Sequence, residues 1–549
     1  MSGKESLRMD GGMEVAGFVR AEGTKLVNGR GQELLLRGVG FGSWLLPEGY
    51  MWRFPDAGDR PRRIERAIRS WIGPEKAERF WEAYYDDYIS EADIEAVAAE
   101  GFNSVRIPIN ARFLIDSAEP LRLREDRLRL LDRLIRWCEN YAIYVVLDLH
   151  GAPGGQTGTN IDDSERDLPE LFTDERNRRL TVELWRILAE RYRDEWIVAG
   201  YDLLNEPLPN WFAQYNDLVM PLYKDIVRAI REVDDRHMII LEGVHWATDW
   251  SIFDERIDDN LMLQFHKYWN NPDTESIRPF LAKREAWNVP IFMGEGGENN
   301  CDWYAGAFRL FEDHGISWNF WTWKKMDCGN SPYSVVRPEG WGRLVRHLEG
   351  GPAPDPADAE RTLWEYLGNL SLERCERRPE VGNALFRRAP VRIPAVFYDY
   401  SGEGASFGVR AAGGAGFREG DGADIRFAEG ARDRPHFQHM RGEAWQPDEW
   451  MYVRLEEGEW AAYTFTVPPA HSARKHVLSV RLRAEGDAAC DIELNDGTPL
   501  GTISEEAGEW RTLSLSQSFL PGFGEHRVRV RTTKGAVGLL WLGLAFAET

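Results

Sequence analysis

The sequence predicts an α/β fold, namely a (β/α)8 TIM barrel followed by an all-β sandwich domain. Eight apolar runs of strand length alternate with helix-length segments over residues 17–375. Most of these runs are apolar throughout, which indicates strands that are buried on both faces in a parallel sheet. Beyond about residue 391 the helical spacing disappears, and short alternating runs lie between clusters of Gly, Asp and Pro, a pattern typical of a sandwich.

The same change of texture divides the 549 residues into segments. We expect a disordered lead over residues 1–16, the barrel over residues 17–375, a linker over residues 376–390 and the sandwich over residues 391–549. An open doubly wound sheet is the nearest alternative to the barrel. It would want a glycine-rich phosphate loop after its first strand, and the run from Gly38 to Gly42 lacks the required spacing into a helix.

The barrel strands follow in order along the chain. The first ends a hairpin-like segment with a turn at Asn28-Gly29, and a long loop without periodicity, residues 42–72, comes after it. The expected strands are residues 33–40, 104–109, 144–150, 198–204, 238–242, 262–266, 289–295 and 316–323. The expected helices include residues 74–100, 128–138, 180–192 and 218–233, the last with a potential kink at Pro221, and a closing helix around residues 363–367.

The charge balance is acidic. The chain has 67 Lys and Arg against 90 Asp and Glu, a formal net charge of −23, and no long basic run, so neither nucleic acid nor an anionic membrane is an expected partner. The amino terminus has no apolar h-region and no run is apolar enough to span a bilayer, so a cytoplasmic protein is expected. The five cysteines are scattered and odd in number, which predicts neither a disulfide framework nor a zinc site.

Two glutamates follow buried runs at the positions where barrel enzymes place their chemistry. Glu206 ends the run that begins at Val198, directly after Asn205, and Glu295 ends the run that begins at Val289. Two carboxylates that separate strands deliver to one site are what glycoside hydrolysis requires, one as proton donor and the other as nucleophile or base. Either glutamate alone is a weak signal, and it is the pair that predicts this chemistry.

Other strand ends carry residues that suit a carboxylate site. Arg106 lies inside an apolar run, where an unpaired guanidinium would be costly, so it is expected to face an anion. His150 ends the third strand, His266 and Tyr268 leave the sixth, and Trp321 or Trp323 leaves the eighth. Each of these residues alone could be structural, and their joint placement at consecutive carboxyl ends favours a site.

Six motifs in the right order resemble family 5 of the glycoside hydrolases. They are Val105-Arg106-Ile107-Pro108, Leu147-Asp148-Leu149-His150-Gly151, Leu204-Asn205-Glu206-Pro207, His266-Lys267-Tyr268, Gly294-Glu295 and Trp321-Thr322-Trp323-Lys324. The resemblance implies a retaining mechanism on a barrel, without metal or cofactor, with Glu206 as acid/base and Glu295 as nucleophile. It also implies the binding roles, namely Asn205 at the sugar 2-hydroxyl, Arg106 and Tyr268 beside the nucleophile, His150 and His266 lining the cleft, Trp321 under the −1 sugar, and Trp323 as a further candidate.

The catalytic set does not choose a substrate. The sequences around His150 and Trp321 look closest to exo-acting β-glucanases and β-glucosidases, so we expect an exo-acting enzyme on short β-glucans, oligosaccharides or glycosides. An endo-β-1,4-glucanase or a β-mannanase or β-mannosidase is the alternative. A non-catalytic sugar-binding barrel is a remote one, because such proteins usually lose one glutamate and this chain keeps both. A metal- or nucleotide-dependent barrel enzyme would need ligand clusters at its strand ends.

The carboxyl-terminal segment resembles the β-sandwich carbohydrate-binding modules. The resemblance lies in the run from Gly458 to Pro468 and in the closing run from Leu539 to Leu544. Its candidate sugar-contacting residues are Trp445, Trp450 and Tyr452, although a sandwich that only shapes the cleft is an equal alternative. His436 and His439 are spaced three apart, but no further ligand follows them, so we expect surface residues rather than a metal pair.

Overall fold

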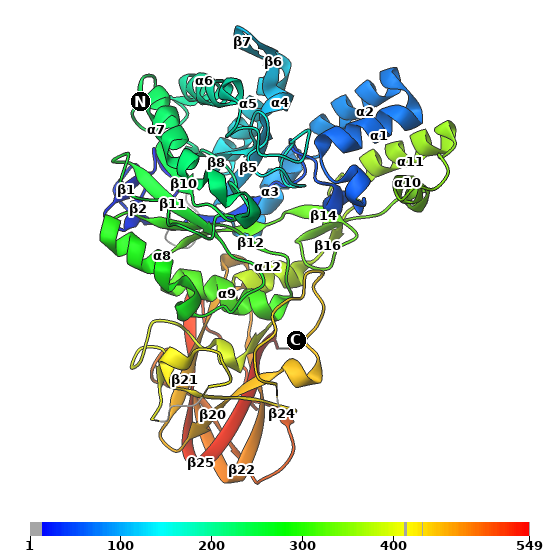
Figure 1. Ribbon diagram of the computed structural model, residues 1–549. Coiled ribbons are helices and arrows are strands. Elements are labelled where there is room, and N and C mark those ends of the chain that lie inside the picture. The colour runs from blue at the N-terminus through cyan, green and yellow to red at the C-terminus, as the bar shows by residue number, and fades with distance from the viewer. Residues whose placement is uncertain (1–13, 411–413, 431, 548–549) are drawn as a thin grey trace. The chain divides into compact units, whose positions relative to one another are not determined.

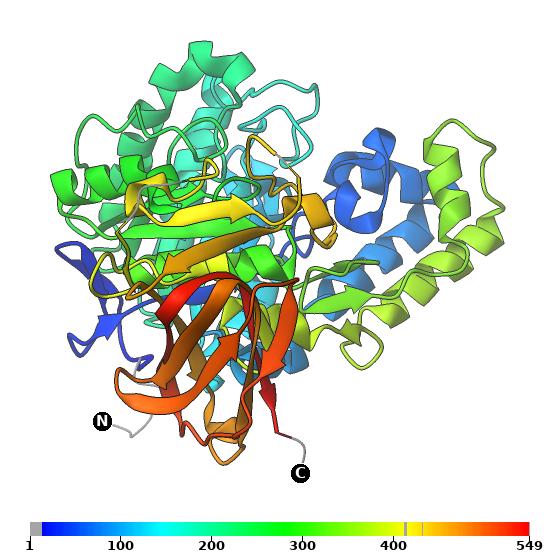
Figure 2. The ribbon, with the colours of Figure 1, turned by 90° about the horizontal axis from the view of Figure 1, so that it is seen from below.

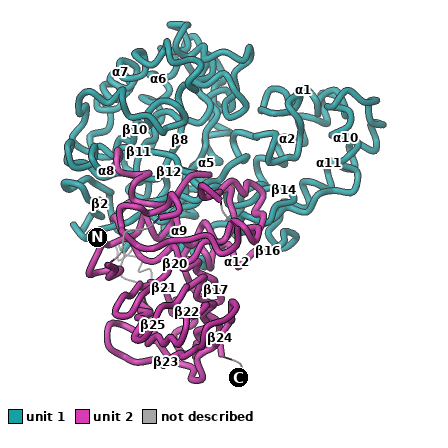
Figure 3. The backbone as a smooth tube through the Cα atoms, turned by 60° about the horizontal axis from the view of Figure 1, so that its bottom comes forward, with its two compact units in different colours: residues 1–267, 282–296, 317–377 teal, residues 268–281, 297–316, 378–549 magenta. Residues whose placement is uncertain are grey.

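The computed structural model describes residues 14–410, 414–430 and 432–547. The chain forms two compact units (Figure 3). The first comprises Met1–Lys267, Ala282–Gly296 and Ser317–Arg377, and the second Tyr268–Leu281, Gly297–Ile316 and Arg378–Thr549. Most of the expected lead, residues 1–13, lies outside the described residues. Residues 14–16 are part of the fold, since Val15 and Ala16 are buried and the Ala16 amide donates a hydrogen bond to the Tyr144 hydroxyl at 3.0 Å.

The first unit contains a closed barrel of parallel strands (Figure 1). In chain order its strands are β4 (Arg37–Gly40), β5 (Ser104–Asn110), β8 (Tyr144–Gly151), β9 (Val198–Asp202), β10 (Met238–Glu242), β11 (Leu261–His266), β12 (Ile291–Gly297) and β13 (Ser317–Trp321). Every residue of the strands from β5 to β13 in this list is buried. The predicted (β/α)8 barrel is therefore confirmed, because runs that are apolar throughout form strands covered on both faces.

Helices lie between most successive barrel strands, and further helices follow the last strand. They are α1 (Pro61–Ile72), α2 (Pro74–Asp87), α3 (Glu91–Glu100), α4 (Ala111–Leu114), α5 (Glu125–Asn140), α6 (Glu175–Tyr192), α7 (Val219–Arg231), α8 (Thr274–Trp287), α9 (Cys301–Asp313), α10 (Trp341–Leu348), α11 (Pro356–Asn369) and α12 (Pro379–Leu385). The 3-10 helices are η1 (Gly49–Trp52), η2 (Asp56–Gly58), η3 (Asn210–Leu218), η4 (Ala395–Phe397), η5 (Glu419–Asp421), η6 (Pro447–Glu449) and η7 (Pro469–His471). Among the described residues, no helix is long and apolar enough to cross a bilayer.

The structure differs from the sequence-based expectations about helices at four places. The expected loop over residues 42–72 ends in α1, which starts with Pro61 and buries Ile64 and Ile68 one turn apart. The expected helix over residues 74–100 is two helices, because Ser90 and Asp93 form a capping box that starts α3. Pro221 kinks nothing, because it lies in the first turn of α7, where an amide would have no partner inside the helix. The linker expected over residues 376–390 contains α12.

An aromatic cluster packs the helices that follow the first barrel strand. The Trp52 ring, which is fully buried, lies 5.1 Å from Tyr84 and 4.8 Å from Tyr366, centroid to centroid. Trp341 packs 5.0 Å from Tyr366 and donates a hydrogen bond to the Trp52 carbonyl at 2.8 Å. The aromatic segments that looked like open loops in the sequence are thus the core of a layer made by α1, α2, α10 and α11.

The second unit is built on one antiparallel sheet of nine strands, visible in Figures 1 and 2. They are β17 (Val391–Pro394), β18 (Phe407–Gly408), β19 (Asp424–Phe427), β20 (Met451–Glu456), β21 (Trp460–Val467), β22 (His476–Leu494), β23 (Thr498–Glu505), β24 (Arg511–Ser514) and β25 (Gly524–Phe546). Burial alternates along β22, and the two long strands pair over most of their length with register shifts. The all-β prediction for this part of the chain is confirmed.

The second unit also contains α9, the helix that connects β12 to β13. Arg392 of β17 forms an ion pair with Asp302 of α9 at 2.6 Å, and Gly306 lies so close to Phe397 that a Cβ atom there would come within 2.6 Å of the ring. The remaining short strands are β1 (Arg20–Glu22), β2 (Lys25–Val27), β3 (Glu33–Leu34), β6 (Ile115–Ala118), β7 (Leu121–Leu123), β14 (Lys324–Met326), β15 (Tyr333–Val335) and β16 (Glu376–Arg377).

Candidate active site

The carboxyl ends of the barrel strands bring most of the predicted site residues together. His150 lies near the end of β8, His266 ends β11, Glu295 lies in β12, and Trp321 ends β13. Glu206 follows β9 by a few residues. Both glutamates are buried but keep a small solvent-exposed fraction, 8% for Glu206 and 5% for Glu295. Parallel strands end at one edge of a barrel, so residues far apart in sequence meet there.

The two glutamates lie close to one another. One carboxylate oxygen of Glu206, one of Glu295 and one ring nitrogen of His266 all lie within 4.8 Å of each other. Carboxyl groups about 5–5.5 Å apart suit direct attack by one of them on the sugar, whereas about 6.5–9.5 Å leaves room for an inverting water. The separation therefore fits a retaining mechanism.

Arg106 is the centre of a buried ion network. It is fully buried in β5 and donates to Glu295 through Nη1 at 2.8 Å and to the Asn205 side-chain oxygen through Nη2 at 2.8 Å. Its other partners are Asp202 at 2.8 Å, Glu242 at 2.9 Å and Asp148 at 3.2 Å. One cation among four carboxylates leaves excess negative charge. Burial, together with Glu242, raises the pKa of Asp202 well above its usual range, so this carboxyl can hold a proton and reduce the excess.

Glu242 holds the turn that carries Glu206. It is fully buried at the end of β10, and its Oε2 accepts a hydrogen bond from the Glu206 amide at 2.7 Å. Glu206 has a φ of 44°, in the left-handed region, which costs a residue with a side chain roughly 1–3 kcal/mol. Backbone strain at this position is therefore offset by a carboxylate that also binds Arg106.

The His266 imidazole lies close to the carboxylates of Glu206 and Glu242. Its Nδ1 lies 2.6 Å from Glu206 Oε1, and its Nε2 lies 3.5 Å from Glu242 Oε2. Burial alone would lower the pKa of His266, but Glu242, Glu295 and Glu206 raise it well above the usual range. The three carboxylates therefore favour the charged form of the imidazole.

The environment of Glu295 has opposing effects on its charge. Burial raises the pKa of its carboxyl above the usual range, and nearby Glu206 adds to that. His266 and Arg106 act in the other direction, with the guanidinium only 2.8 Å away. Arg106 therefore opposes the effect of burial on the pKa of Glu295. The sizes of these two effects could not be predicted from the sequence alone.

A stacked pair forms one wall of the site. The His150 ring lies parallel to Trp321, with 5.6 Å between centroids and 1° between planes. His150 Nδ1 lies 2.7 Å from Asp148, and Trp321 donates to the Tyr50 hydroxyl at 2.8 Å. The glycine at position 40 is required, because a Cβ atom there would come within 2.6 Å of the Trp321 indole. The indole is thus held in one position.

One predicted site residue, Trp323, lies elsewhere. Trp323 is fully buried, donates to Asp93 at 2.9 Å and packs on Tyr333 at 4.9 Å. β13 ends at Trp321, so the alternation that would have placed Trp323 on the same face does not continue. Tyr268 belongs to the second unit, where its ring packs 5.2 Å from Trp269, and its role beside Glu295 stays a prediction.

An exposed aromatic pair follows β9 and β10. Trp211 of η3 is 59% exposed, and its ring lies 5.9 Å from Trp246 in an edge-to-face arrangement. The two loops are joined by a hydrogen bond from the His245 amide to the Leu208 carbonyl at 2.8 Å. The pair is therefore tied to the segment that begins at Glu206. The sequence analysis did not single out either tryptophan, although the exposed Trp after a catalytic-type strand was a readable signal.

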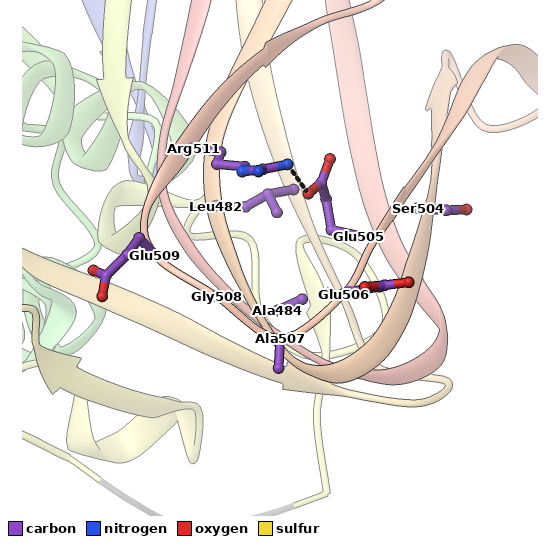
Figure 4. Close-up of a pocket in the computed structure, with 9 residues that line it drawn as sticks. All are labelled: Leu482, Ala484, Ser504, Glu505, Glu506, Ala507, Gly508, Glu509 and Arg511. Atoms are coloured by element: carbon purple, nitrogen blue, oxygen red, sulfur yellow. Dashed lines mark hydrogen bonds and ion pairs between the residues drawn. The ribbon is translucent and has the colours of Figure 1, made fainter.

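The second unit gives little support to its candidate sugar contacts. Trp445 and Tyr452 are buried, Trp445 against Phe437 at 5.8 Å and Tyr452 against Trp510 at 5.2 Å. A cavity of about 420 Å3 between β22 and the turn from β23 to β24 is shown in Figure 4. Its lining residues include no aromatic ring on which a sugar could stack, and they are Leu482, Ala484, Ser504, Glu505, Glu506, Ala507, Gly508, Glu509 and Arg511.

Comparison with known proteins agrees with this geometry. A family model described as cellulase (glycosyl hydrolase family 5) matches residues 67–327. A beta-xylosidase of Phanerodontia chrysosporium is 32% identical over 46% of this chain and 52% of its own length, so the chain spans about half of that relative. A glucan 1,3-beta-glucosidase of Candida oleophila is 30% identical over 56% of this chain and 71% of its own. Endoglucanase C of Acetivibrio thermocellus is 25% identical over 47% of this chain and 90% of its own.

Proposed function

The chain belongs to glycosyl hydrolase family 5, and on that premise we propose that it hydrolyses the β-glucosidic bonds of short β-glucans, oligosaccharides or glycosides from chain ends. It is a retaining β-glycoside hydrolase. The observation that supports the mechanism is that one carboxylate oxygen of Glu206 and one of Glu295 lie within 4.8 Å of each other, which fits the short carboxyl separation of retaining enzymes.

In the proposed double displacement, Glu295 attacks the anomeric carbon while Glu206 gives its proton to the glycosidic oxygen. The carbon–oxygen bond to the leaving group breaks, and a glycosyl ester of Glu295 forms. Glu206, now a carboxylate, takes a proton from water, which attacks the ester and releases the sugar with its configuration retained. Contact with Arg106 supports Glu295 as the nucleophile, because the guanidinium stabilises the charged form.

The binding roles follow from the same geometry. Asn205 is fixed by Arg106 and lies next to Glu206, which supports a contact with the sugar 2-hydroxyl. The His150–Trp321 pair supports a stacking surface under the −1 sugar, and His266 supports the proton cycle of Glu206 through its 2.6 Å contact.

Exo action is the finer part of the proposal. It is supported by two relatives that are named as a beta-xylosidase and a glucan 1,3-beta-glucosidase. The alternative of an endo-acting β-1,4-glucanase is favoured by the relative named Endoglucanase C, whereas a β-mannanase or β-mannosidase stays a prediction of the sequence. A cytoplasmic location stays a prediction of the sequence.

Product analysis tests both parts of the proposal. Laminari-, cello- and manno-oligosaccharides labelled at the reducing end are digested, and the products are followed from the first turnover. An exo enzyme releases one product size from the unlabelled end throughout, whereas early products of mixed length would establish the endo alternative. Proton NMR of the first product gives its anomeric configuration, and an inverted product would refute the retaining mechanism.

A further inference from the structure

A second cluster of ligand-type side chains lies in the second unit, far along the chain from the catalytic pair. His436 and His439 lie in the segment between β19 and β20, and the fold supplies the third member that the sequence did not reveal, Glu449 at the end of η6. One ligand-type atom of each residue lies within 4.8 Å of the others. Two imidazoles and one carboxylate form a ligand set that Zn²⁺ prefers.

The distances are close to those of a metal site. His439 Nε2 lies 3.6 Å from Glu449 Oε2. Two ligands of a tetrahedral zinc ion with bonds of about 2.0–2.2 Å are themselves about 3.3–3.6 Å apart, which this pair matches. His436 Nδ1 lies 2.7 Å from Glu449 Oε1, as in a hydrogen bond, so this pair needs to separate by less than about 1 Å to admit an ion.

Burial supports a ligand role for His439. Both His439 and Glu449 are only 5% exposed, and in the described structure His439 Nε2 is a buried atom without a hydrogen-bond partner. A buried polar atom without a partner is costly, and an ion between it and Glu449 would satisfy it. His436 is partly exposed, so water can reach the fourth position.

The surroundings hold the carboxylate in place. The Gln446 amide donates to Glu449 Oε2 at 2.7 Å, the kind of outer contact that orients a metal ligand. Arg432 forms a long ion pair with Glu449 Oε1 at 3.7 Å and a closer one with Asp448 at 2.7 Å. The closest contact of this guanidinium is therefore with Asp448 rather than with Glu449.

We propose that His436, His439 and Glu449 bind a divalent transition-metal ion of the Zn²⁺ type, with water as the fourth ligand. The ion would join the segment before η6 to the start of β20. It would stabilise the second unit through binding to the folded state alone. The proposal does not depend on the reaction proposed above.

The test uses the full chain, treated with a chelator, dialysed and titrated with Zn²⁺ alone against a competing chromophoric chelator. We expect one equivalent to bind in the wild type, with affinity reduced by more than about 100-fold in His439→Ala and in Glu449→Gln, since loss of even an outer-shell partner costs about 10–100-fold. His471→Ala and Glu443→Gln are matched controls in the same unit and should bind like the wild type. Substitution with Co²⁺ should give the intense visible absorption of a tetrahedral site.

Two further variants make the outcome decisive. His436→Ala removes the partly exposed ligand with the least risk to folding, and it should also weaken binding. The double variant Glu206→Gln, Glu295→Gln should bind Zn²⁺ as the wild type does. The proposal is overturned if no stoichiometric ion binds, if the three ligand variants keep wild-type affinity, or if binding is lost only in the double variant.

Discussion

Two buried arginines, one in each unit, differ in the partners of their guanidinium groups. Arg106 in the barrel has side-chain partners that can change charge or contact a substrate, four carboxylates and one amide. Arg418 in the second unit pairs with one carboxylate, Asp421, at 2.7 Å, and otherwise donates to backbone carbonyls, including those of Val396 and Asp399 at 3.2 and 2.9 Å. Its guanidinium lies 3.4 Å from the centre of the Tyr398 ring. Burial of a guanidinium, even with an ion pair, does not by itself mark an active site, and the cluster of several carboxylates is what distinguishes Arg106.

The largest effect on turnover is expected at Glu295, the member of the barrel network that attacks the anomeric carbon. Replacing Glu295 by Gly should reduce kcat by on the order of 10^4-fold or more, because the covalent step is lost. Azide should restore turnover on activated glycosides, since it fits the space of the removed carboxylate, and the product should have inverted configuration. Rates with and without azide, with NMR of the product, measure this. Full activity of the variant on natural substrate would show that Glu295 is not the nucleophile.

Glu206 lies in the same cluster as Glu295, but its replacement should give a different phenotype. Glu206→Ala should lose about 10^2- to 10^4-fold on natural substrates, because the leaving oxygen is no longer protonated. Aryl glycosides whose leaving group needs no proton should still form the glycosyl ester rapidly. A plot of rate against leaving-group pKa, steep in the variant and shallow in the wild type, measures this. Equal losses on all substrates would contradict the acid role.

The two arginines can be compared directly by replacing each with Met. Arg106→Met should cost about 3–5 kcal/mol of stability, because it leaves buried carboxylates unpaired, and kcat should fall as well. Arg418→Met should cost about 1–3 kcal/mol for each carbonyl left without a donor, with kcat unchanged. Thermal unfolding and kinetics of both variants measure the pair. If Arg418→Met lowered kcat at unchanged folding, the contrast between the two units would be wrong.

The charged groups of the barrel network should also make the stability of the folded protein depend on pH. Since the pKa of His266 is raised in the folded state, the stability it contributes is fully present below its unfolded pKa of about 6.5. It is lost as the pH rises through the higher folded value, at about 1.4 kcal/mol for each pH unit. His266→Gln should abolish this slope while the wild type keeps it. Unfolding midpoints from pH 6 upward, at roughly unit intervals, measure the difference.

The smallest effect concerns the exposed aromatic pair. Trp211→Ala should weaken binding of longer leaving groups by about 0.5–1.5 kcal/mol, because a stacking surface is lost, and should leave small aryl glycosides unaffected. Trp364→Ala, at an exposed aromatic residue of α11, is the matched control. KM values for substrates of increasing length measure the effect. Equal changes in KM for substrates of all lengths would show that the exposed aromatic pair does not contact the substrate.

The barrel could be predicted because its strands are buried on both faces and therefore apolar throughout. α1 could not, because the Arg and Pro residues around Pro61 and Ile64 hide its period in a segment that looks like a loop. Glu206 and Glu295 were predictable because they end such runs. Trp323 was misplaced, since the sequence does not show where β13 stops.

The network around Arg106 was only half visible. Arg106 was noticed because a charge in a buried run needs a partner, and the same reasoning applies to Asp148 and Asp202, which lie inside apolar runs of their own. Glu242 also ends an apolar run, and the structure shows that it binds both Arg106 and the Glu206 amide. Glu449 was missed because its approach to His436 depends on a turn that brings residues together without any fixed spacing.

The membership of α9 in the second unit has a practical consequence for anyone dissecting this enzyme. The polypeptide enters that unit after Glu295 and returns to the barrel before Trp321, so the two halves are interleaved along the gene rather than arranged in tandem. A truncation after Arg377 would strip α9 of Phe397 and Arg392, its neighbours from later in the chain. A barrel fragment without the second unit should therefore aggregate on expression, and a domain swap in this enzyme has to preserve five junctions together instead of one.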